Sequence, residues 1–447
     1  MLPKLPTIEE AARLMRQKEL TPLDLVEHCL VRIAQFEDRI HAWVLVDEEG
    51  ARKEAKRLTD MLARGEDRGP LHGIPIGIKD IIDVAGWQTK CGSKLRENVA
   101  PAEKDATVVA NLRKAGAIIL GKTVTTEFAC FDPPPTRNPW NLNHTPGGSS
   151  SGSAAAVAME MCMAALGTQT GGSIIRPAAY CGVCGYKGSF DPYVMWGIMP
   201  LTMHLDHVGP MARTAADVIT TASLATPPWF SNLEWLKEQS SRNLVFHYCP
   251  EYFAAESSPD VWQALESCLK RLRELGHHTI AVKPIPGFAD VHQMHRRIMA
   301  VEAARFHRRS FETKSSDYSP HIAALISEGL SMPAVDYAHA IAQWEFGRHT
   351  KSRWLHTDGN PMHQACALLV PATPSGAPSK ATTGDPKFNS PFSFYGMPAM
   401  TVPIGTDGDG MPIGIQIVST NRQWAWIPAL IIEKCIGWNK RPLLLNY

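Results

Sequence analysis

Two short clusters of glycine and serine lie close together in the chain, and their residue types suit one kind of chemistry. The first cluster spans residues 147–153 (GGSSSGS), and the second spans residues 167–173 (GTQTGGS). Glycine allows sharp turns and lets backbone N–H groups approach a ligand closely. A serine at the end of a Gly-Gly turn can present its hydroxyl and neighbouring N–H donors to one carbonyl. The pattern therefore favours acyl transfer, which needs a nucleophile and an oxyanion hole.

A lysine upstream of both clusters is a candidate base. Lys79 ends an alternating apolar run (IPIGI) that is typical of a strand with one buried face. Small residues on its own face, Gly73, Pro75 and Gly77, leave space beside it. To act near neutral pH, a lysine must lose roughly two to three units of its ordinary pKa of about 10.4 through burial or like-charged neighbours. We therefore predict that Lys79 is buried, while the sequence leaves open whether Asp80 approaches it.

The elements that must position these residues alternate between helix and strand patterns. Thr7 and Thr21 suit helix N-caps near the N-terminus. Residues 153–166 (SAAAVAMEMCMAAL) predict a tightly packed helix between the two clusters, and 259–275 predict another. Apolar runs predict strands at residues 74–78, 117–120, 244–248, 279–282, 367–370, 397–404 and 412–418. The alternation predicts an α/β fold with a large mixed, mostly parallel β-sheet flanked by helices on both faces.

Several segments resemble the amidase-signature family. The segment 72–80 (HGIPIGIKD) is similar to the strand that bears the family's catalytic lysine. Residues 147–156 followed by 167–188 are similar to its serine-glycine signature, and 205–214 and 394–403 also resemble family segments. The likeness runs from about residue 7 to the C-terminus and is weakest at 225–365. It implies a single domain, 1–447, with an N-terminal helical part (1–64), a signature core (65–220), a variable substrate-pocket region (221–366) and returning strands (367–447).

The resemblance assigns roles position by position. Ser173 matches the nucleophile, Ser149 matches the serine that follows a cis peptide bond, and Lys79 matches the base. The backbone N–H groups of Thr170, Gly171, Gly172 and Ser173 match the oxyanion hole.

Two positions depart from the common family pattern. Gln169 stands where many relatives carry Asp, which puts in doubt any hydrogen bond that the Asp would make. Arg176 comes one residue later than in relatives with Ser-Ile-Arg. Because the three catalytic positions are intact, we interpret both departures as marks of a subgroup.

The implied activity is hydrolysis of amide C–N bonds through an acyl-enzyme on Ser173. Carbamates (urethanes) and esters are chemically close alternatives. By the same resemblance, the pocket walls come from residues 128–131, 133–135 and 371–394. The aromatic and proline residues in these segments predict small hydrophobic or aryl substrates. The candidate pocket residues are Phe128, Cys130, Phe131, Pro133, Phe388 and Phe392. Two other classes stay open, namely an amidotransferase subunit that supplies ammonia from glutamine or asparagine within a multi-subunit complex, and a non-catalytic binding protein on the same scaffold.

Composition and charge limit the classes of molecule that the protein is expected to bind. The 447-residue chain has a formal net charge of +1 and 20% charged residues, so nothing indicates nucleic acid or an anionic membrane surface. No apolar stretch predicts a signal peptide or a membrane span. The ten cysteines are irregularly spaced, which suits reduced thiols in a cytoplasmic protein. We expect a monomer or homodimer that acts on a small-molecule amide or carbamate with no metal and no cofactor.

Three weaker signals compete with this interpretation. Residues 148–152 also spell G-x-S-x-G, in which Ser150 would be the nucleophile, but a turn-rich loop precedes them instead of the required strand. Cys181 and Cys184 form a CxxC without a second ligand pair, so packing is the better interpretation. His204 and His207 flank Asp206, for which we favour a structural role over a metal site.

Overall fold

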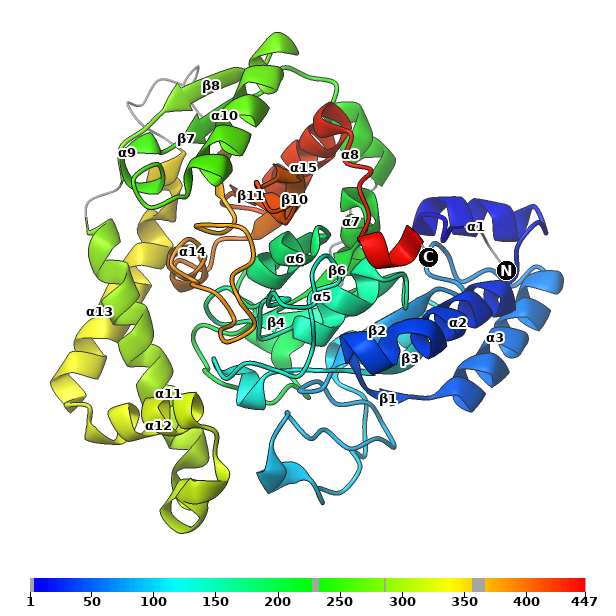
Figure 1. Cartoon of the computed structure of the whole chain (residues 1–447), viewed down its shortest axis with the longest axis horizontal. Helices are drawn as coiled ribbons and strands as arrows, with labels where there is room; N and C mark the ends of the chain where they lie inside the picture. The colour runs from blue at the N-terminus through cyan, green and yellow to red at the C-terminus, as the bar shows by residue number, and fades with distance from the viewer. Residues whose placement is uncertain (1–3, 227–232, 285–286, 356–365, 447) are drawn as a thin grey trace.

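The computed structural model describes residues 4–226, 233–284, 287–355 and 366–446. Its centre is an 11-stranded sheet within those residues (Figure 1). The strands are β1 (Trp43–Val46), β2 (Pro75–Lys79), β3 (Ile118–Thr123), β4 (Ala164–Gln169), β5 (Cys184–Lys187), β6 (His207–Ala212), β7 (Val245–Tyr248), β8 (His278–Ala281), β9 (Ala367–Pro371), β10 (Ala399–Thr406) and β11 (Pro412–Val418). Their spatial order is β1-β3-β2-β4-β6-β5-β10-β11-β9-β7-β8.

The predicted large mixed sheet is confirmed, with a smaller share of parallel pairs than expected. Parallel pairings join β3-β2-β4 and β9-β7-β8. The other six of the ten pairings are antiparallel. One reason is that β10 and β11 follow each other through a short turn at residues 407–411, and a short connection permits only antiparallel pairing.

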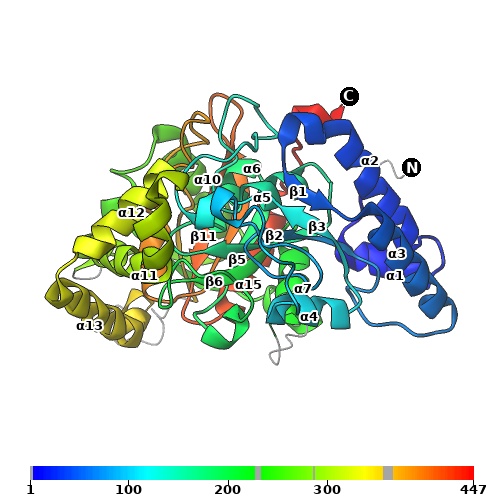
Figure 2. The same cartoon turned by 90° about the horizontal axis from the view of Figure 1, so that it is seen from below.

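Helices cover both faces of the sheet. In Figure 2, α5 and α6 lie on one side of it, whereas α4 and α7 lie on the other, and α1–α3 and α11–α13 occupy opposite ends of the molecule. The longer helices are α1 (Ile8–Arg16), α2 (Pro22–Ile40), α3 (Glu48–Ala63), α4 (Thr107–Lys114), α5 (Ser151–Ala158), α6 (Ile175–Cys181), α7 (Ala215–Ala225), α8 (Leu233–Gln239), α10 (Pro259–Glu274), α11 (Val291–Lys314), α12 (Pro320–Ser331), α13 (Ala334–Thr350) and α15 (Gln423–Ile436). The short helices are α9 (Pro250–Phe253) and α14 (Ser390–Phe394).

Local sequence explains where the first helices begin. The Thr7 hydroxyl accepts from the Glu10 N–H ahead of α1. Thr21 and Asp24 form a capping box ahead of α2, which has proline at its first position. Both predicted N-caps are confirmed.

The prediction of one helix over residues 153–166 is wrong. Helix α5 ends at Ala158, Glu160 adopts a left-handed backbone (φ 57°), and the chain continues as β4. Alanine favours a helix, but residues 164–166 pair with β2 and residues 164–169 pair with β6, and such tertiary pairing overrides a weak local propensity. As a result, the second glycine-serine cluster lies at the end of a central strand, β4.

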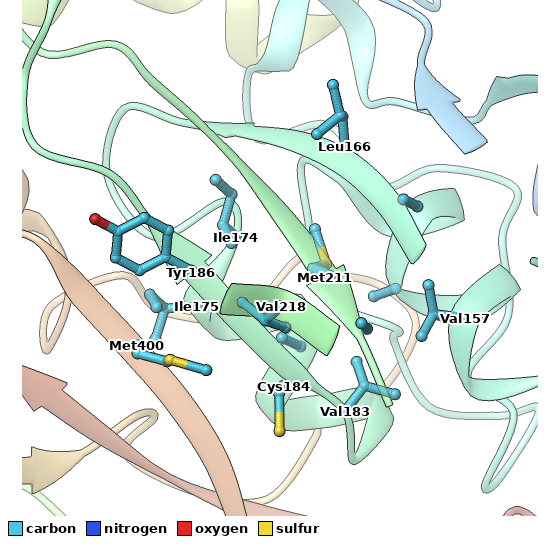
Figure 3. Close-up of a cluster of buried hydrophobic side chains, with 14 of the residues drawn as sticks. Val157, Leu166, Ile174, Ile175, Val183, Cys184, Tyr186, Met211, Val218 and Met400 are labelled. Atoms are coloured by element: carbon cyan, nitrogen blue, oxygen red, sulfur yellow. The ribbon is translucent and has the colours of Figure 1, made fainter. Parts of the chain in front are cut away.

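A dense apolar core packs around the elements that carry the two clusters. Figure 3 shows side chains from α5, β4, α6, β5, β6 and α7 packed together, among them Val157, Leu166, Ile174, Tyr186 and Met211. All five of these side chains are buried. The elements that carry the serines are therefore fixed by packing on neighbouring strands and helices. No helix within the described residues is both long and apolar enough to cross a lipid bilayer.

Candidate active site

Lys79 lies at the end of the central strand β2 and is completely buried. Its Nζ donates to Ser149 Oγ at 2.7 Å and to Thr168 Oγ1 at 2.8 Å. A Cβ added at Gly77 would lie 3.0 Å from Thr123 Cγ2, so this part of the strand needs a small residue. The sequence therefore places the lysine, as predicted, in a closely packed strand beside the first serine cluster.

Burial sets the charge state of Lys79. Loss of water around the ammonium lowers its pKa to about 7, although the Asp206 carboxylate and Cys91 act in the opposite direction. Asp80 is directed elsewhere, because its Oδ1 pairs with the Lys122 ammonium at 2.9 Å. Near neutral pH, a large share of the Lys79 amines are uncharged and can accept a proton.

Ser149 follows a cis peptide bond from Gly148, as the resemblance implied. The buried Arg176 guanidinium holds this bond from one side, since its Nη2 donates to the Gly148 carbonyl at 2.8 Å. Ser150 is engaged in structure: its hydroxyl donates to the Thr168 carbonyl and accepts from the Thr168 N–H, each at 3.2 Å. The G-x-S-x-G interpretation, with Ser150 as nucleophile, therefore finds no support in the geometry.

Ser173 lies next to the first cluster, just before helix α6. The Ser150 N–H donates to the Ser173 carbonyl at 3.3 Å, so the two serine-containing segments are in direct contact. The Ser173 side chain is 8% exposed, whereas Ser149 is 1% exposed. In the described part of the chain, neither Ser149 nor any other residue forms a hydrogen bond with the Ser173 hydroxyl. The geometry thus joins Lys79 to Ser149 directly and brings the Ser173 backbone beside them.

The turn at residues 170–173 presents free donors. Among the residues described, the N–H groups of Gly171, Gly172 and Ser173 have no protein acceptor. A Cβ at Gly172 would lie only 2.5 Å from Asn389 Oδ1, which explains the glycine there. The Thr170 hydroxyl donates to Asp206 Oδ1 at 2.6 Å. Free N–H groups at a tight turn can bind a developing oxyanion.

Asp206 and Gln169 support this turn. The Asp206 carboxylate accepts from the N–H groups of Leu201 and Thr202 at 2.8 and 3.0 Å, a structural role in agreement with the sequence prediction. Gln169 Oε1 accepts from the N–H groups of Ile174 and Ile175 at 2.9 and 3.0 Å. The amide at position 169 thus makes backbone hydrogen bonds of the kind that an aspartate oxygen could make.

The predicted pocket residues differ in exposure. Phe128 and Cys130 are buried, and the Phe128 ring packs on His307 at 4.3 Å between centroids. The segment touches the site through its backbone, because the Thr126 N–H donates to the Ser149 carbonyl at 3.2 Å. Phe131 is half-buried and Pro133 is exposed.

On the other side, Phe388 and Phe392 are fully buried. The Phe388 ring packs on Phe253 at 4.9 Å between centroids. Pro386, close in sequence to both rings, lies near the turn: its Cβ would be 3.4 Å from a Cβ added at Gly171.

Sequence reasoning missed several residues of the site. Thr168 is the second partner of Lys79, and sequence reasoning placed it in the second glycine-serine cluster, whereas it lies in strand β4. His295 in α11 and Ser393 in α14 donate to carbonyls of the 170–173 turn. His295 belongs to the segment where the family likeness is weakest, so no motif could have found it.

The cysteines and histidines that the sequence analysis set aside are engaged in packing and hydrogen bonding. Cys181 and Cys184 are buried free thiols, and burial raises the pKa of both. His204 pairs with the buried carboxylate of Glu302, and His207 Nδ1 contacts the Gln169 carbonyl at 3.3 Å. No group of three His, Cys, Asp or Glu side chains suited to a metal ion occurs in the described ranges.

Comparison with known proteins agrees with the fold described above. An amidase family model matches residues 24–423, so the chain belongs to the amidase family of hydrolases. A relative from Roseiflexus castenholzii, one of the subunits of its glutamyl-tRNA(Gln) amidotransferase, is 33% identical over 92% of this chain and 91% of that protein.

Solved structures give the same result. One amidase has 32% identity and a TM-score of 0.84, with 96% of this chain and 99% of that chain covered. The peptide amidase from Stenotrophomonas maltophilia has 26% identity and a TM-score of 0.82, with 98% of each chain covered.

Proposed function

We propose that this protein hydrolyses amide bonds of small molecules through an acyl-enzyme on Ser173, with Ser149 and Lys79 as the proton relay. The observation that carries the proposal is the 2.7 Å hydrogen bond between Lys79 Nζ and Ser149 Oγ at a lysine whose pKa burial lowers to about 7. A buried amine that is partly neutral at physiological pH suits a general base.

The proposed reaction has two halves. Neutral Lys79 takes a proton from Ser149, which takes one from Ser173 as the Ser173 hydroxyl attacks the amide carbonyl. The N–H groups of residues 170–173 stabilise the oxyanion of the tetrahedral intermediate. The protons return through the relay to the leaving nitrogen, the C–N bond breaks, and water then hydrolyses the acyl-enzyme.

For the substrate, we propose small hydrophobic or aryl amides, with carbamates or esters as further candidates. Support comes from the aromatic residues around the site, of which Phe131 is half-buried and near the exposed Pro133. Release of amine from a panel of aliphatic amides, anilides and carbamates tests this choice. A clear preference for charged, strongly polar amides would contradict it.

Two variants test the relay. Ser173→Ala should abolish acyl-enzyme formation, and Lys79→Ala should lower kcat/KM at least about a hundredfold, the lower range for loss of a general base. A fluorophosphonate probe should label the wild type and fail to label Ser173→Ala. Ser150→Ala is a matched control for labelling at Ser173, because its hydroxyl is bonded to the Thr168 backbone. If Lys79→Ala kept near-normal turnover, the assignment of the base would be wrong. Labelling also separates an enzyme from a non-catalytic binding protein.

A second candidate function is to supply ammonia as one component of a multi-subunit amidotransferase. The 33% identity to a component of a glutamyl-tRNA(Gln) amidotransferase favours it. Under this alternative, the chain would co-purify with partner proteins and release ammonia from glutamine or asparagine only with them. Turnover of small amides by the isolated chain, without co-purifying partners, would exclude it.

A further inference from the structure

Three consecutive peptide groups of the 170–173 turn share one arrangement. The Thr170 carbonyl accepts from His295 Nε2 at 2.9 Å, and the Gly171 carbonyl accepts from Ser393 Oγ at 2.8 Å. The Gly172 carbonyl accepts from the Arg176 N–H at 2.9 Å. The N–H at the other end of each of these peptides, on Gly171, Gly172 and Ser173, has no protein acceptor in the described residues.

Peptide geometry links the two ends of each group. In a trans peptide, the C=O and the N–H are coplanar and point in opposite directions. A hydrogen bond that holds the carbonyl therefore also fixes the direction of the N–H, one residue later. We call these three hydrogen bonds to carbonyls anchors. The His295 anchor fixes the direction of the Gly171 N–H, the Ser393 anchor that of the Gly172 N–H, and the third that of the Ser173 N–H. Only the third anchor belongs to the turn and its own helix.

His295 is suited to hold a peptide in place. It lies in α11 and is 4% exposed, and burial lowers its pKa to about 4, so the ring is neutral at physiological pH. A carbonyl oxygen can only accept, so the proton must reside on Nε2. The tautomer is therefore fixed by the contact with Thr170, and the donor does not vary with pH above about 5.

Ser393 is fixed in a similar way. Its side chain is fully buried in α14, and its Oγ accepts from Gln169 Nε2 at 3.1 Å. This leaves the hydroxyl proton for the Gly171 carbonyl. Gln169 also accepts from the N–H groups of Ile174 and Ile175, at the start of α6, so one amide side chain connects Ser393 to the segment that follows Ser173.

We propose that His295 and Ser393 are positioning residues that aim the Gly171 and Gly172 N–H groups at the oxyanion. This inference rests on the proposed function, because it assigns the geometry of the same site. Neither residue needs to touch the substrate; each acts through one carbonyl. Their role is therefore to stabilise the transition state, and they should contribute little to binding of the ground state.

The test compares His295→Phe and Ser393→Ala with wild type on one anilide substrate. Loss of a direct oxyanion donor costs about 10²–10³ in kcat, so loss of an anchor should lower kcat about tenfold to a hundredfold, with KM changed less than about twofold. His295→Gln, which restores an N–H donor, and Ser393→Thr, which restores the hydroxyl, should recover part of kcat. His292→Phe is the matched control on the same helix, because the two ring nitrogens of His292 form hydrogen bonds with Tyr252 and Ser390.

The outcomes separate this inference from the proposed function. If wild type hydrolyses the anilide but both variants keep kcat within about twofold, the positioning role is wrong and the reaction stands. A loss that appears equally in KM, or in His292→Phe, would also overturn the positioning role. If wild type neither hydrolyses amides nor reacts with a fluorophosphonate, the proposed function itself fails. Ser393→Ala is the smaller change and keeps the test valid should His295→Phe fold poorly.

Discussion

The charge of Lys79 gives the sharpest prediction, because burial changes it by a large and measurable amount. The pKa falls from 10.5 to about 7. At 1.36 kcal/mol per unit, this corresponds to roughly 5 kcal/mol of extra cost for the charged form in the folded protein. About half of the molecules then carry a neutral amine at pH 7, whereas an unshifted lysine would be neutral in only about one molecule in 3000.

The sign of the pH dependence follows from the role of a base. Only the neutral amine can take the Ser149 proton, so kcat/KM should rise about tenfold per pH unit below pH 7 and level off above about pH 8. The measurement is kcat/KM for a chromogenic anilide between pH 5 and 10, with stability checked at each pH. A flat profile over this range, or a break near pH 10, would refute the role of burial in activating Lys79.

Lys79→Arg separates the base from a merely positive charge at this position. A guanidinium stays protonated throughout this pH range, so it can donate to Ser149 but cannot accept its proton. Activity should fall at least about a hundredfold at every pH, and the break near pH 7 should disappear. Lys434→Arg, an exposed change on α15, should keep the wild-type profile.

Three further changes probe the surroundings of the relay. Thr168→Val removes a hydroxyl that accepts from the Lys79 ammonium, so it should lower the lysine pKa further and move the kinetic break below pH 7; an upward shift would contradict this. Gly172→Ala places a Cβ 2.5 Å from an asparagine oxygen and should lower kcat at least about tenfold, whereas Gly171→Ala, whose nearest neighbour is 3.4 Å away, should be milder by the same assay. Gln169→Leu removes the acceptor of the Ile174 and Ile175 N–H groups at the start of α6, so it should lower the free energy of unfolding, measured in urea, by about 2–4 kcal/mol. An unchanged midpoint would show that these bonds contribute little.

The sequence predicts the parts of the site that are held by local pattern. An alternating strand that ends at Lys79 and a Gly-Gly-Ser turn are both short-range signals, and the structure joins the lysine to Ser149 as expected. The same local reasoning failed at residues 164–169, where alanine and glycine carry no periodicity and pairing with β2 and β6 decides the strand. Sheet order was beyond local reasoning as well, because strands far apart in the chain pair directly, as Lys187 of β5 does with Ala399 of β10.

Residues that hold the turn from outside were beyond prediction for a related physical reason. A single hydrogen bond to a carbonyl can come from any element that reaches it, so it leaves no required spacing in the sequence. His295 lies 125 residues from Thr170, and Ser393 lies 222 residues from Gly171. Several side chains of helix α11 are buried against the rest of the protein, and the imidazole of His295 is the part of this helix that bonds to the candidate oxyanion turn. We therefore expect substitutions of His295, in the variable region 221–366, to change turnover while the motif residues stay intact.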